Sequence, residues 1–420
     1  MTPEIKQRIE QIRRGEVPER YVKTALGLAP ANWKRYTFGD IYTERKEPGD
    51  ENLPLLMVSI HSGVSDGEVD AAELPKQVKR IEDKSQYKKA VSGDLVFNMM
   101  RAWQGAIGTV RTTGMVSPAY IVAEPNDKVN PLFMDYYSRT PQMINQIDRQ
   151  SYGVTDFRKR LYWDSFAPIG CILPPIEEQQ KIATILTTQE KVIKLKEKRL
   201  AEKQRQKKYL MQQLLTGKKR LPGFNGTWEK EKLGKCASMC SGGTPDTKNE
   251  KYYGNDYIWI SIKDMTSVGK YICSSERGLT EAGLLNCSAR LFPKGTILFA
   301  MYASIGECSI AETECCSSQA ILGIEPDSKL NNEFLYYLLS NSKGYFKIFG
   351  QASSQPNLNK GIVQSIVVQI PEIEEQDAIA EVLSAADREI DLLQQDIEQE
   401  KQKKKALMQL LLTGIVRVKT

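Results

Sequence analysis

Histidine is nearly absent from this chain of 420 residues, in which His61 is the single histidine. A Ser-His-Asp or Cys-His catalytic arrangement would have only that one base, and nothing near His61 resembles a nucleophile elbow. The sequence also contains no Gly-x4-Gly-Lys-Ser/Thr phosphate loop and no Asn/Asp-Pro-Pro-Tyr/Phe adenine-methyltransferase motif. These absences argue against hydrolysis, nucleotide binding and methyl transfer by the chain itself.

Long hydrophobic runs and a disulfide framework are missing as well. No window approaches 18 uncharged apolar residues, and the opening MTPEIKQRIEQIRR lacks the apolar core of a signal peptide. We therefore expect a cytoplasmic protein without membrane contact. Cys236, Cys240, Cys315 and Cys316 could in principle hold zinc, but no Cys-x2-Cys pair occurs, and buried free thiols are the better interpretation. No metal is expected.

The positive charge is concentrated in one segment. Residues 176–220 carry 13 basic and 5 acidic side chains, a net charge of +8, whereas residues 373–420 carry −3. The large segments 33–175 and 221–372 are nearly neutral, at 0 and −1. Composition alone therefore does not indicate nucleic-acid binding.

The chain consists of two copies of one unit. Residues 176–217 and 373–414 share 18 identities in 42 positions at a constant offset of 197, including Ile-Glu-Glu-Gln at the start and Leu-Leu-Thr-Gly at the end. A weaker match joins residues 93–99 to 295–301 upstream. Each copy is a variable module followed by a well-kept segment.

Each well-kept segment is predicted to be a long helix. Each follows a proline, begins with acidic residues and ends at Thr-Gly, and apolar residues recur in heptads. The alternative is a helix packed on the core of its own domain, but the middle of the first helix is too polar for that. The opposite charges favour antiparallel pairing of the two helices. The residues expected to pair them are Leu186, Ile193, Leu200 and Leu214 with Leu383, Ile390, Ile397 and Leu411.

The variable modules combine short β-like runs, loops rich in Gly, Pro and Ser, and a few helices, so we expect an α/β (α+β) fold for each. The predicted architecture is two such modules in tandem, each followed by a long α-helix, with the helices paired as an antiparallel coiled coil and a pseudo-two-fold internal repeat. An amphipathic helix over residues 1–14 is expected to pack against the C-terminal long helix. The predicted divisions are 1–32 (N-terminal helix and lead-in), 33–175 (module 1), 176–220 (helix 1), 221–372 (module 2) and 373–420 (helix 2).

Three loops have the composition of DNA-contacting segments. Ser-Gly-Gly-Thr-Pro at 241–245 could approach a phosphate through backbone N–H groups. The loop at 353–360 is rich in amide and hydroxyl groups, and 152–160 occupies the matching place in module 1. Ordinary turn chemistry is the alternative for each loop alone. Recurrence at the same place in both units favours function.

Two other classes of function remain open. Asp246, Asp327 and Lys329 could be assembled into a nuclease-like site, although the sequence gap is long. The helices could also make the chain a coiled-coil scaffold that joins other proteins without reading bases.

These patterns resemble the DNA-specificity subunit of Type I restriction–modification systems. The resemblance rests on the loop at 241–245, residues 259–265, 295–306 and 355–360, and the repeated segments ending at 217 and 414. It covers essentially the whole chain. Module 1 departs from the pattern, because it lacks the Gly-Gly-Thr-Pro loop and has Arg-Ala-Trp-Gln-Gly at 101–105 where module 2 has Tyr302-Ala303-Ser304.

The resemblance implies two target-recognition domains that each read one half of a bipartite double-stranded DNA target. It further implies two methyltransferase subunits that carry S-adenosylmethionine and two motor-nuclease subunits that use ATP and Mg, with no cofactor and no catalytic residue in this chain. The residues expected to contact DNA are Arg101, Trp103, Gln104, Tyr152, Arg158, Lys159 and Arg160 in module 1, and Gly242, Gly243, Thr244, Lys263, Tyr302, Ser304, Gln355, Asn357, Asn359 and Lys360 in module 2.

Overall fold

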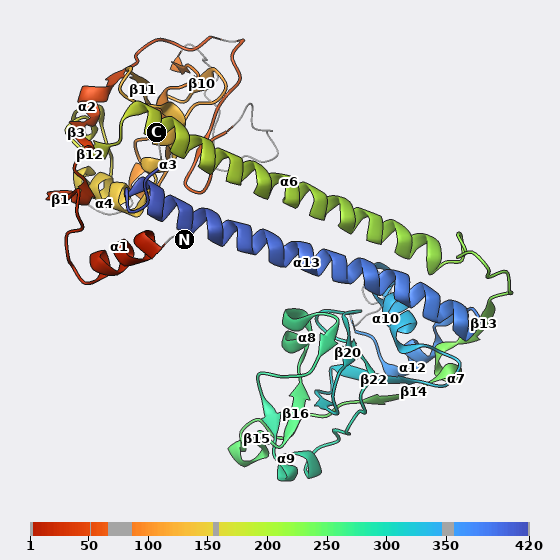
Figure 1. Ribbon diagram of the computed structural model, residues 1–420. Coiled ribbons are helices and arrows are strands. Elements are labelled where there is room, and N and C mark those ends of the chain that lie inside the picture. The colour runs from red at the N-terminus through yellow and green to blue at the C-terminus, as the bar shows by residue number, and fades with distance from the viewer. Residues whose placement is uncertain (1–2, 51, 66–85, 154–158, 347–356, 419–420) are drawn as a thin grey trace. The chain divides into compact units, whose positions relative to one another are not determined.

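The computed structural model divides the chain into two compact units (Figure 1). Unit 1 holds Met1–Lys196 together with Asp396–Thr420, and unit 2 holds Glu197–Gln395. The long helices α6 (Ile176–Leu214) and α13 (Ile373–Leu412) therefore each contribute to both units. The residues that the structure describes are 3–50, 52–65, 86–153, 159–346 and 357–418.

Unit 1 is built on a four-stranded antiparallel sheet. Its strand order is β4 (Tyr42–Glu44), β11 (Tyr120–Pro125), β8 (Leu95–Asn98) and β9 (Ile107–Thr109). Leu95, Val96 and Phe97 are fully buried, because β8 is central and both of its faces are covered. A continuous apolar run suits a strand in that position.

Smaller elements surround this sheet. The hairpin β1–β2 and the pairs β3–β12, β5–β6 and β7–β10 are all antiparallel. The strands of these pairs are β1 (Tyr21–Thr24), β2 (Gly27–Pro30), β3 (Lys34–Thr37), β12 (Gly170–Leu173), β5 (Val58–Ser59), β6 (Gly63–Val64), β7 (Lys88–Ala90) and β10 (Gly114–Val116). The helices are α1 (Pro3–Arg13), α2 (Phe38–Ile41), η2 (Ala102–Gln104), α3 (Pro131–Tyr137), α4 (Pro141–Gln150) and α5 (Trp163–Phe166).

Unit 2 repeats the same strand order and extends it by one strand. Its main sheet runs β14-β22-β19-β20-β17, from Ala237–Ser241, Ile321–Pro326, Ile297–Ala300, Cys308–Ala311 and Tyr271–Ile272. β19 is the counterpart of β8 and is likewise fully buried. The weak sequence match between 93–99 and 295–301 thus corresponds to the central strand of each sheet.

A second sheet and a strand pair complete unit 2. The strand order of the second sheet is β15 (Tyr253–Gly254), β18 (Gly278–Leu279), β16 (Tyr257–Ile260) and β21 (Cys316–Ser317). Separately, β13 (Glu229–Lys232) pairs with β23 (Val367–Ile370), as β3 does with β12 in unit 1. The helices are α7 (Leu233–Cys236), η4 (Glu250–Tyr252), α8 (Ile262–Val268), α9 (Glu281–Leu285), α10 (Asn332–Asn341) and α12 (Lys360–Ser365).

Each long helix starts directly after a proline-containing turn and ends before a glycine. Gly217 and Gly414 follow the helices with φ of +67° and +71°. This left-handed conformation closes a helix C-terminus and favours glycine. The repeated Leu-Leu-Thr-Gly sequence is therefore a helix stop.

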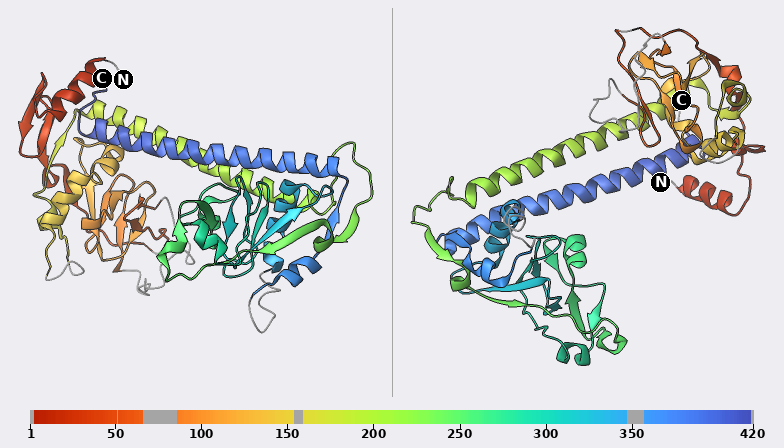
Figure 2. Two further views of the ribbon diagram at one scale, coloured as in Figure 1. Left: turned by 90° about the horizontal axis from the view of Figure 1, so that it is seen from below. Right: turned by 180° about the vertical axis from the view of Figure 1, so that it is seen from behind.

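Side chains of α6 and α13 meet in both units. In unit 1, Gln189 donates to Glu400 at 2.5 Å and Lys196 lies 2.8 Å from Asp396. In unit 2, Lys203 lies 2.8 Å from Glu389, and Lys207 pairs with Asp387. Residue numbers rise on one helix as they fall on the other, so the contacting segments run in opposite directions (Figure 2).

The heptad residues fall into two groups. Seven of the eight are buried and Leu200 is half-buried. Those nearest the helix ends also belong to module cores: Leu186 and Leu411 in unit 1, and Leu214 and Leu383 in unit 2. The heptad residues nearest the helix ends are therefore part of the module cores.

The N-terminal helix and the first strand each contact the segment after α13. Arg8 donates to the carbonyl of Ile415 at 3.2 Å, and Tyr21 donates to that of Gly414 at 2.6 Å. No helix within the described ranges combines the length and the apolar character needed to cross a membrane.

Candidate nucleic-acid interface

In module 1 the structure brings the segment 98–104 beside the segment 159–162. Leu161 N–H donates to the carbonyl of Met99 at 2.8 Å, and Tyr152 and Arg160 exchange two backbone hydrogen bonds of 3.1 and 2.9 Å. Met99 and Leu161, 62 positions apart in the sequence, thus share one surface. These two segments hold five of the seven residues expected from the sequence. Tyr152 joins them through its bridge to Arg160, and Arg158 lies outside the described residues.

The side chains of these segments divide into exposed and engaged groups. Arg101, Gln104, Tyr152 and Arg160 are exposed. Lys159 instead pairs with Asp148 at 2.8 Å and lies 5.2 Å above the ring of Trp103. The indole N–H of Trp103 donates to the carbonyl of Met100 at 3.0 Å. Lys159 and Trp103 therefore support the surface, while the other four present groups to solvent.

Module 2 builds the same arrangement from different residues. Leu358 N–H donates to the carbonyl of Met301 at 3.1 Å, as Leu161 does to Met99. Asn357 and Lys360 are exposed, whereas Tyr302 and Ser304 are half-buried and Tyr302 packs against the core. Asn359 is exposed, but its side-chain oxygen accepts from Ile362 N–H at 3.0 Å and caps α12. Gln355 lies outside the described residues.

The structure contradicts the DNA-contacting role expected for the glycines of the 241–245 loop. Gly242 and Gly243 are buried, and their N–H groups donate to Ile321 and Ser317 at 3.0 and 2.8 Å. A Cβ on Gly242 would lie 2.2 Å from the Ser317 carbonyl oxygen. Close packing requires these glycines, and their N–H groups are already used, so the expected phosphate contact through them is wrong.

Two other expected residues make local contacts near the surface. Thr244 donates its hydroxyl to the side chain of Gln319, an exposed amide that the sequence analysis did not select. Lys263 is 75% exposed and pairs with Glu276 at 2.6 Å. Tyr162, exposed beside Tyr152, was also missed. Its position matches that of Asn359 at the offset of 197, and this is the signal that could have found it.

The residues of the nuclease alternative do not meet. Asp327 follows β22, whose Pro326 pairs with Ala237 at the start of β14, whereas Asp246 lies beyond Ser241 at its other end. Four strand steps separate these ends by about 13 Å. Within the described ranges, no three His, Cys, Asp or Glu side chains gather as a metal site.

A matching set of contacts joins each module to a long helix. In unit 1, Arg417 forms a two-pronged salt bridge with Glu178, with both N···O distances 2.7 Å, and the indole N–H of Trp33 donates to the same carboxylate at 3.3 Å. The Glu178 side chain is fully buried. We call this set of three residues the clasp of unit 1.

The clasp of unit 2 has the same chemistry. Arg220 contacts Glu375 at 2.5 and 2.6 Å, and Trp228 donates to Glu375 at 3.2 Å. Arg220 and Glu375 correspond to Arg417 and Glu178 at the offset of 197. Both arginines lie just beyond the repeated segments and were therefore not predicted from the repeat.

The glutamines of the two Ile-Glu-Glu-Gln motifs are also equivalent. Gln179 accepts from Asn130 N–H at 2.8 Å, and Gln376 accepts from Asn331 N–H at 2.9 Å. Each asparagine in turn caps the helix that follows it, α3 or α10. The repeated motif thus fixes each module to the start of its helix.

Glu190 connects module 1 to both long helices. It accepts from Tyr136 at 2.8 Å, and its carboxylate lies 3.4 Å from Arg111 and 3.1 Å from Lys404. Burial disfavours the charged form of Glu190, but Lys404, Tyr136 and Arg111 outweigh it and lower its pKa to about 2. The carboxylate is therefore ionised at neutral pH.

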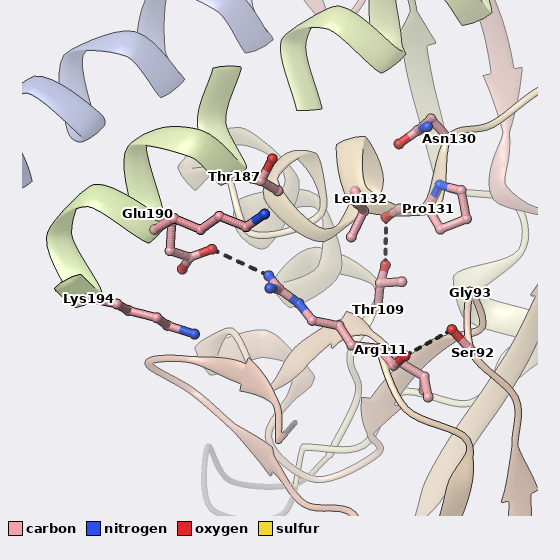
Figure 3. Close-up of a pocket in the computed structure, with 12 residues that line it drawn as sticks. Ser92, Gly93, Thr109, Arg111, Asn130, Pro131, Leu132, Thr187, Glu190 and Lys194 are labelled. Carbon is pink, nitrogen blue, oxygen red and sulfur yellow. Dashed lines mark hydrogen bonds and ion pairs between the residues drawn. The ribbon is translucent and has the colours of Figure 1, made fainter. Parts of the chain in front are cut away.

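A cavity of about 610 Å³ opens beside Glu190 (Figure 3). Arg111 points across it to Glu190, and Thr187 and Lys194 line it from α6. The counterpart of Thr187 in unit 2, Ser384, instead binds the amine of Lys270 at 3.0 Å. The two junctions therefore differ at this pair of equivalent positions.

Comparison with known proteins assigns the family. The family model for the Type I restriction modification DNA specificity domain matches residues 65–204 and again residues 225–402. The chain belongs to this Type I specificity family. The two matches correspond to the two modules with parts of their helices, in keeping with a specificity protein that carries the domain twice.

Individual relatives support the assignment. The putative MjaX specificity subunit of Methanocaldococcus jannaschii is 25% identical over 436 residues, which cover 96% of this chain and 98% of that protein. The MjaIX specificity subunit of the same organism is 36% identical over 163 residues, which span 38% of each chain. The HsdS subunit structure from Thermoanaerobacter tengcongensis shares the fold, with a TM-score of 0.51 and 19% identity over 92% of this chain and 98% of that one.

Proposed function

We propose that the chain chooses the DNA sequence for a Type I restriction–modification complex, with each module reading one half of a bipartite duplex target. The observation that carries the proposal is the repeated surface segment, residues 98–104 beside 159–162 in module 1 and 301–304 beside 357–360 in module 2. The scaffold is the same in both, but the exposed side chains differ. That combination suits two readers of different half-sites.

The proposed recognition domains are residues 33–175 and 221–372, after a lead-in of 1–32. We propose that 176–220 and 373–420 pair as an antiparallel coiled coil and that the two copies are related by a pseudo-two-fold axis. The paired clasps and the shared order of four strands support this arrangement, as do the opposing charges of Lys196 with Glu400 and Lys203 with Glu389.

Two methyltransferase subunits would dock on the long helices. Leu195 on α6 and Leu392 on α13 are identical residues at the offset of 197, and they are 67% and 64% exposed. A large apolar side chain kept at an exposed position in both helices is a suitable anchor for a partner. Equivalent anchors on the two helices favour two copies of one subunit.

The chemistry of the complex would belong to its other subunits. S-adenosylmethionine would be bound by the methyltransferase subunits, and ATP and Mg by two motor-nuclease subunits, in a cytoplasmic host-defence system. The full-length chain alone should therefore transfer no methyl group and cleave no DNA. Either activity in a preparation freed of partner subunits would contradict the proposal.

Exchange of a module tests the proposed reading of half-sites. Residues 33–175 would be replaced by the module of another family member, and the methylated sites of cells expressing the complex would be sequenced. One half of the methylated sequence should change while the other half stays the same. Change in both halves would refute independent reading, and methylation without any sequence preference would favour a scaffold.

The docking proposal has a separate test. Leu195→Asp or Leu392→Asp should lower the number of methyltransferase subunits recovered with the chain, and the double variant should recover none. Leu285→Asp is the matched control, because Leu285 is 76% exposed on α9, away from the long helices. Full recovery with the double variant would remove these leucines from the docking surface.

A further inference from the structure

Two tyrosines form an exposed aromatic pair in module 1. The rings of Tyr152 and Tyr162 have centroids 5.9 Å apart and planes inclined by 37°. Their exposures are 59% and 40%, although most large aromatic residues of this module are buried. Large aromatic side chains that are exposed to solvent and lie next to one another mark a binding surface.

Backbone hydrogen bonds order the chain at both tyrosines. Tyr152 lies in the two-bond bridge to Arg160, and Tyr162 is the residue before α5, where its carbonyl accepts from Phe166 N–H at 3.0 Å. The intervening Leu161 is buried and bonded to Met99. Because the backbone that carries both rings is already ordered, little backbone freedom is lost on binding.

Positive charge flanks the pair. Arg160 and Arg101 are exposed, and Arg101 lies two residues along the chain from Met99. Guanidinium groups suit a phosphate backbone or a guanine edge. The neighbouring Lys159 pairs with Asp148, whereas Arg101 and Arg160 are exposed on the same surface.

Module 2 places an amide where module 1 places a ring. Asn359 precedes α12 as Tyr162 precedes α5, and both follow a leucine bonded to the loop of the central strand. Asn357 similarly takes the place of Arg160. Module 2 therefore offers hydrogen-bonding groups at a point where module 1 offers apolar surface.

The geometry of the ring pair limits how it can meet DNA. One inserted ring fills a gap of about 3.4 Å, the spacing of stacked bases. Two tilted rings with centroids 5.9 Å apart are too thick for that. Against the major groove, an apolar surface recognises the 5-methyl group of thymine.

We propose that Tyr162, supported by Tyr152, is a specificity-determining residue of module 1 that packs against a thymine methyl group in the first half-site. The inference rests on the proposed function, because it requires module 1 to bind duplex DNA. It adds the residue and the chemical group that it reads.

The test combines protein and DNA substitutions in a binding assay with the full-length chain, in the assembly purified from cells. The target is first defined from methylated sites, and each thymine of the first half-site is then replaced by uracil in turn. Loss of one buried methyl group should weaken wild-type binding about fourfold at one position. Tyr162→Ala should bind the normal target roughly three- to tenfold more weakly and should no longer respond to uracil at that position.

A matched variant makes the result specific. Tyr162→Phe keeps the ring and should behave as the wild type. The Tyr162 side chain makes no cap hydrogen bond, so its loss should leave α5 and the thermal melting temperature unchanged. An alanine variant that keeps wild-type affinity and the uracil response would overturn the inference, as would equal losses for the Phe and Ala variants. A wild-type protein without preference for its target over scrambled duplex would overturn the proposed function as well.

Discussion

The clasp of unit 1 allows a quantitative prediction. Arg417→Ala would leave the fully buried Glu178 carboxylate with Trp33 as its remaining partner in the clasp. Removing one member of a buried ion pair costs about 3–5 kcal/mol, because the other charge stays desolvated. Arg417 is 30% exposed, so water can reach part of the vacated space, and we expect a loss of about 2–4 kcal/mol.

A global melting curve is a poor assay for this variant, because a chain of two units need not unfold in one step. Hydrogen exchange measured by mass spectrometry reports local opening instead. Arg417→Ala should speed exchange in β3 and β12 of unit 1 and leave β13 and β23 of unit 2 unchanged. Arg220→Ala removes the arginine partner of the equivalent Glu375 and should therefore speed exchange in β13 and β23 while leaving β3 and β12 unchanged.

An exposed pair between the helices provides the control. Arg199 is 63% exposed and lies 3.5 Å from Glu389, so Arg199→Ala should cost less than about 0.5 kcal/mol. Arg417→Lys should be intermediate, since lysine cannot form the two-pronged contact. If Arg417→Ala matched Arg199→Ala, or accelerated exchange equally in both units, the clasp would not be a local support of unit 1.

Other parts of the structure give further expectations. The folded-state pKa of Glu190, about 2, lies below its usual value of 4.5, so its stabilisation, at most about 3 kcal/mol, is present above pH 4.5 and lost as pH falls toward 2; urea titrations should show the gap between wild type and Glu190→Gln closing over that range. Asn357→Ala should weaken target binding by about 1–3 kcal/mol and leave random DNA unaffected, while Lys360→Ala should weaken both equally and flatten the salt dependence; equal losses for Asn357→Ala would assign that loop to turn chemistry. Gly242→Ala should destabilise unit 2, because its Cβ would meet the Ser317 carbonyl at 2.2 Å, and unchanged hydrogen exchange in β14 and β21 would contradict this.

Local patterns allowed the long helices to be predicted closely. The prolines, acidic first turns and Thr-Gly stops give α6 and α13 nearly the bounds expected, because these signals act within a few residues. The strand order could not be derived in the same way. β4 pairs with β11 across some 80 residues, and nothing in either short strand specifies that partner.

The site was less predictable for a similar reason. Gly242 was expected to contact a phosphate because its loop is small and rich in glycine. Ser317, which encloses Gly242, lies far along the chain, so only the fold shows that this glycine is buried. Arg417 and Glu178 are 239 residues apart, yet the offset of 197 between Arg220 and Arg417 was visible in the sequence. Extending the repeat comparison three residues past each glycine would have found both arginines.

Unit 1 is formed by two separate stretches of the chain, and this affects how the protein folds during its synthesis. Its core includes Leu411 and Leu412 as well as residues of the first half, so it cannot be completed until residues 396–420 have been made. Unit 2 is continuous and can fold while it emerges from the ribosome. At about 5–20 residues per second, module 1 waits roughly 10–40 seconds for its last segment. During that interval Ile182 and Leu186 lack their partners from α13, which makes the nascent first half a natural client for chaperones.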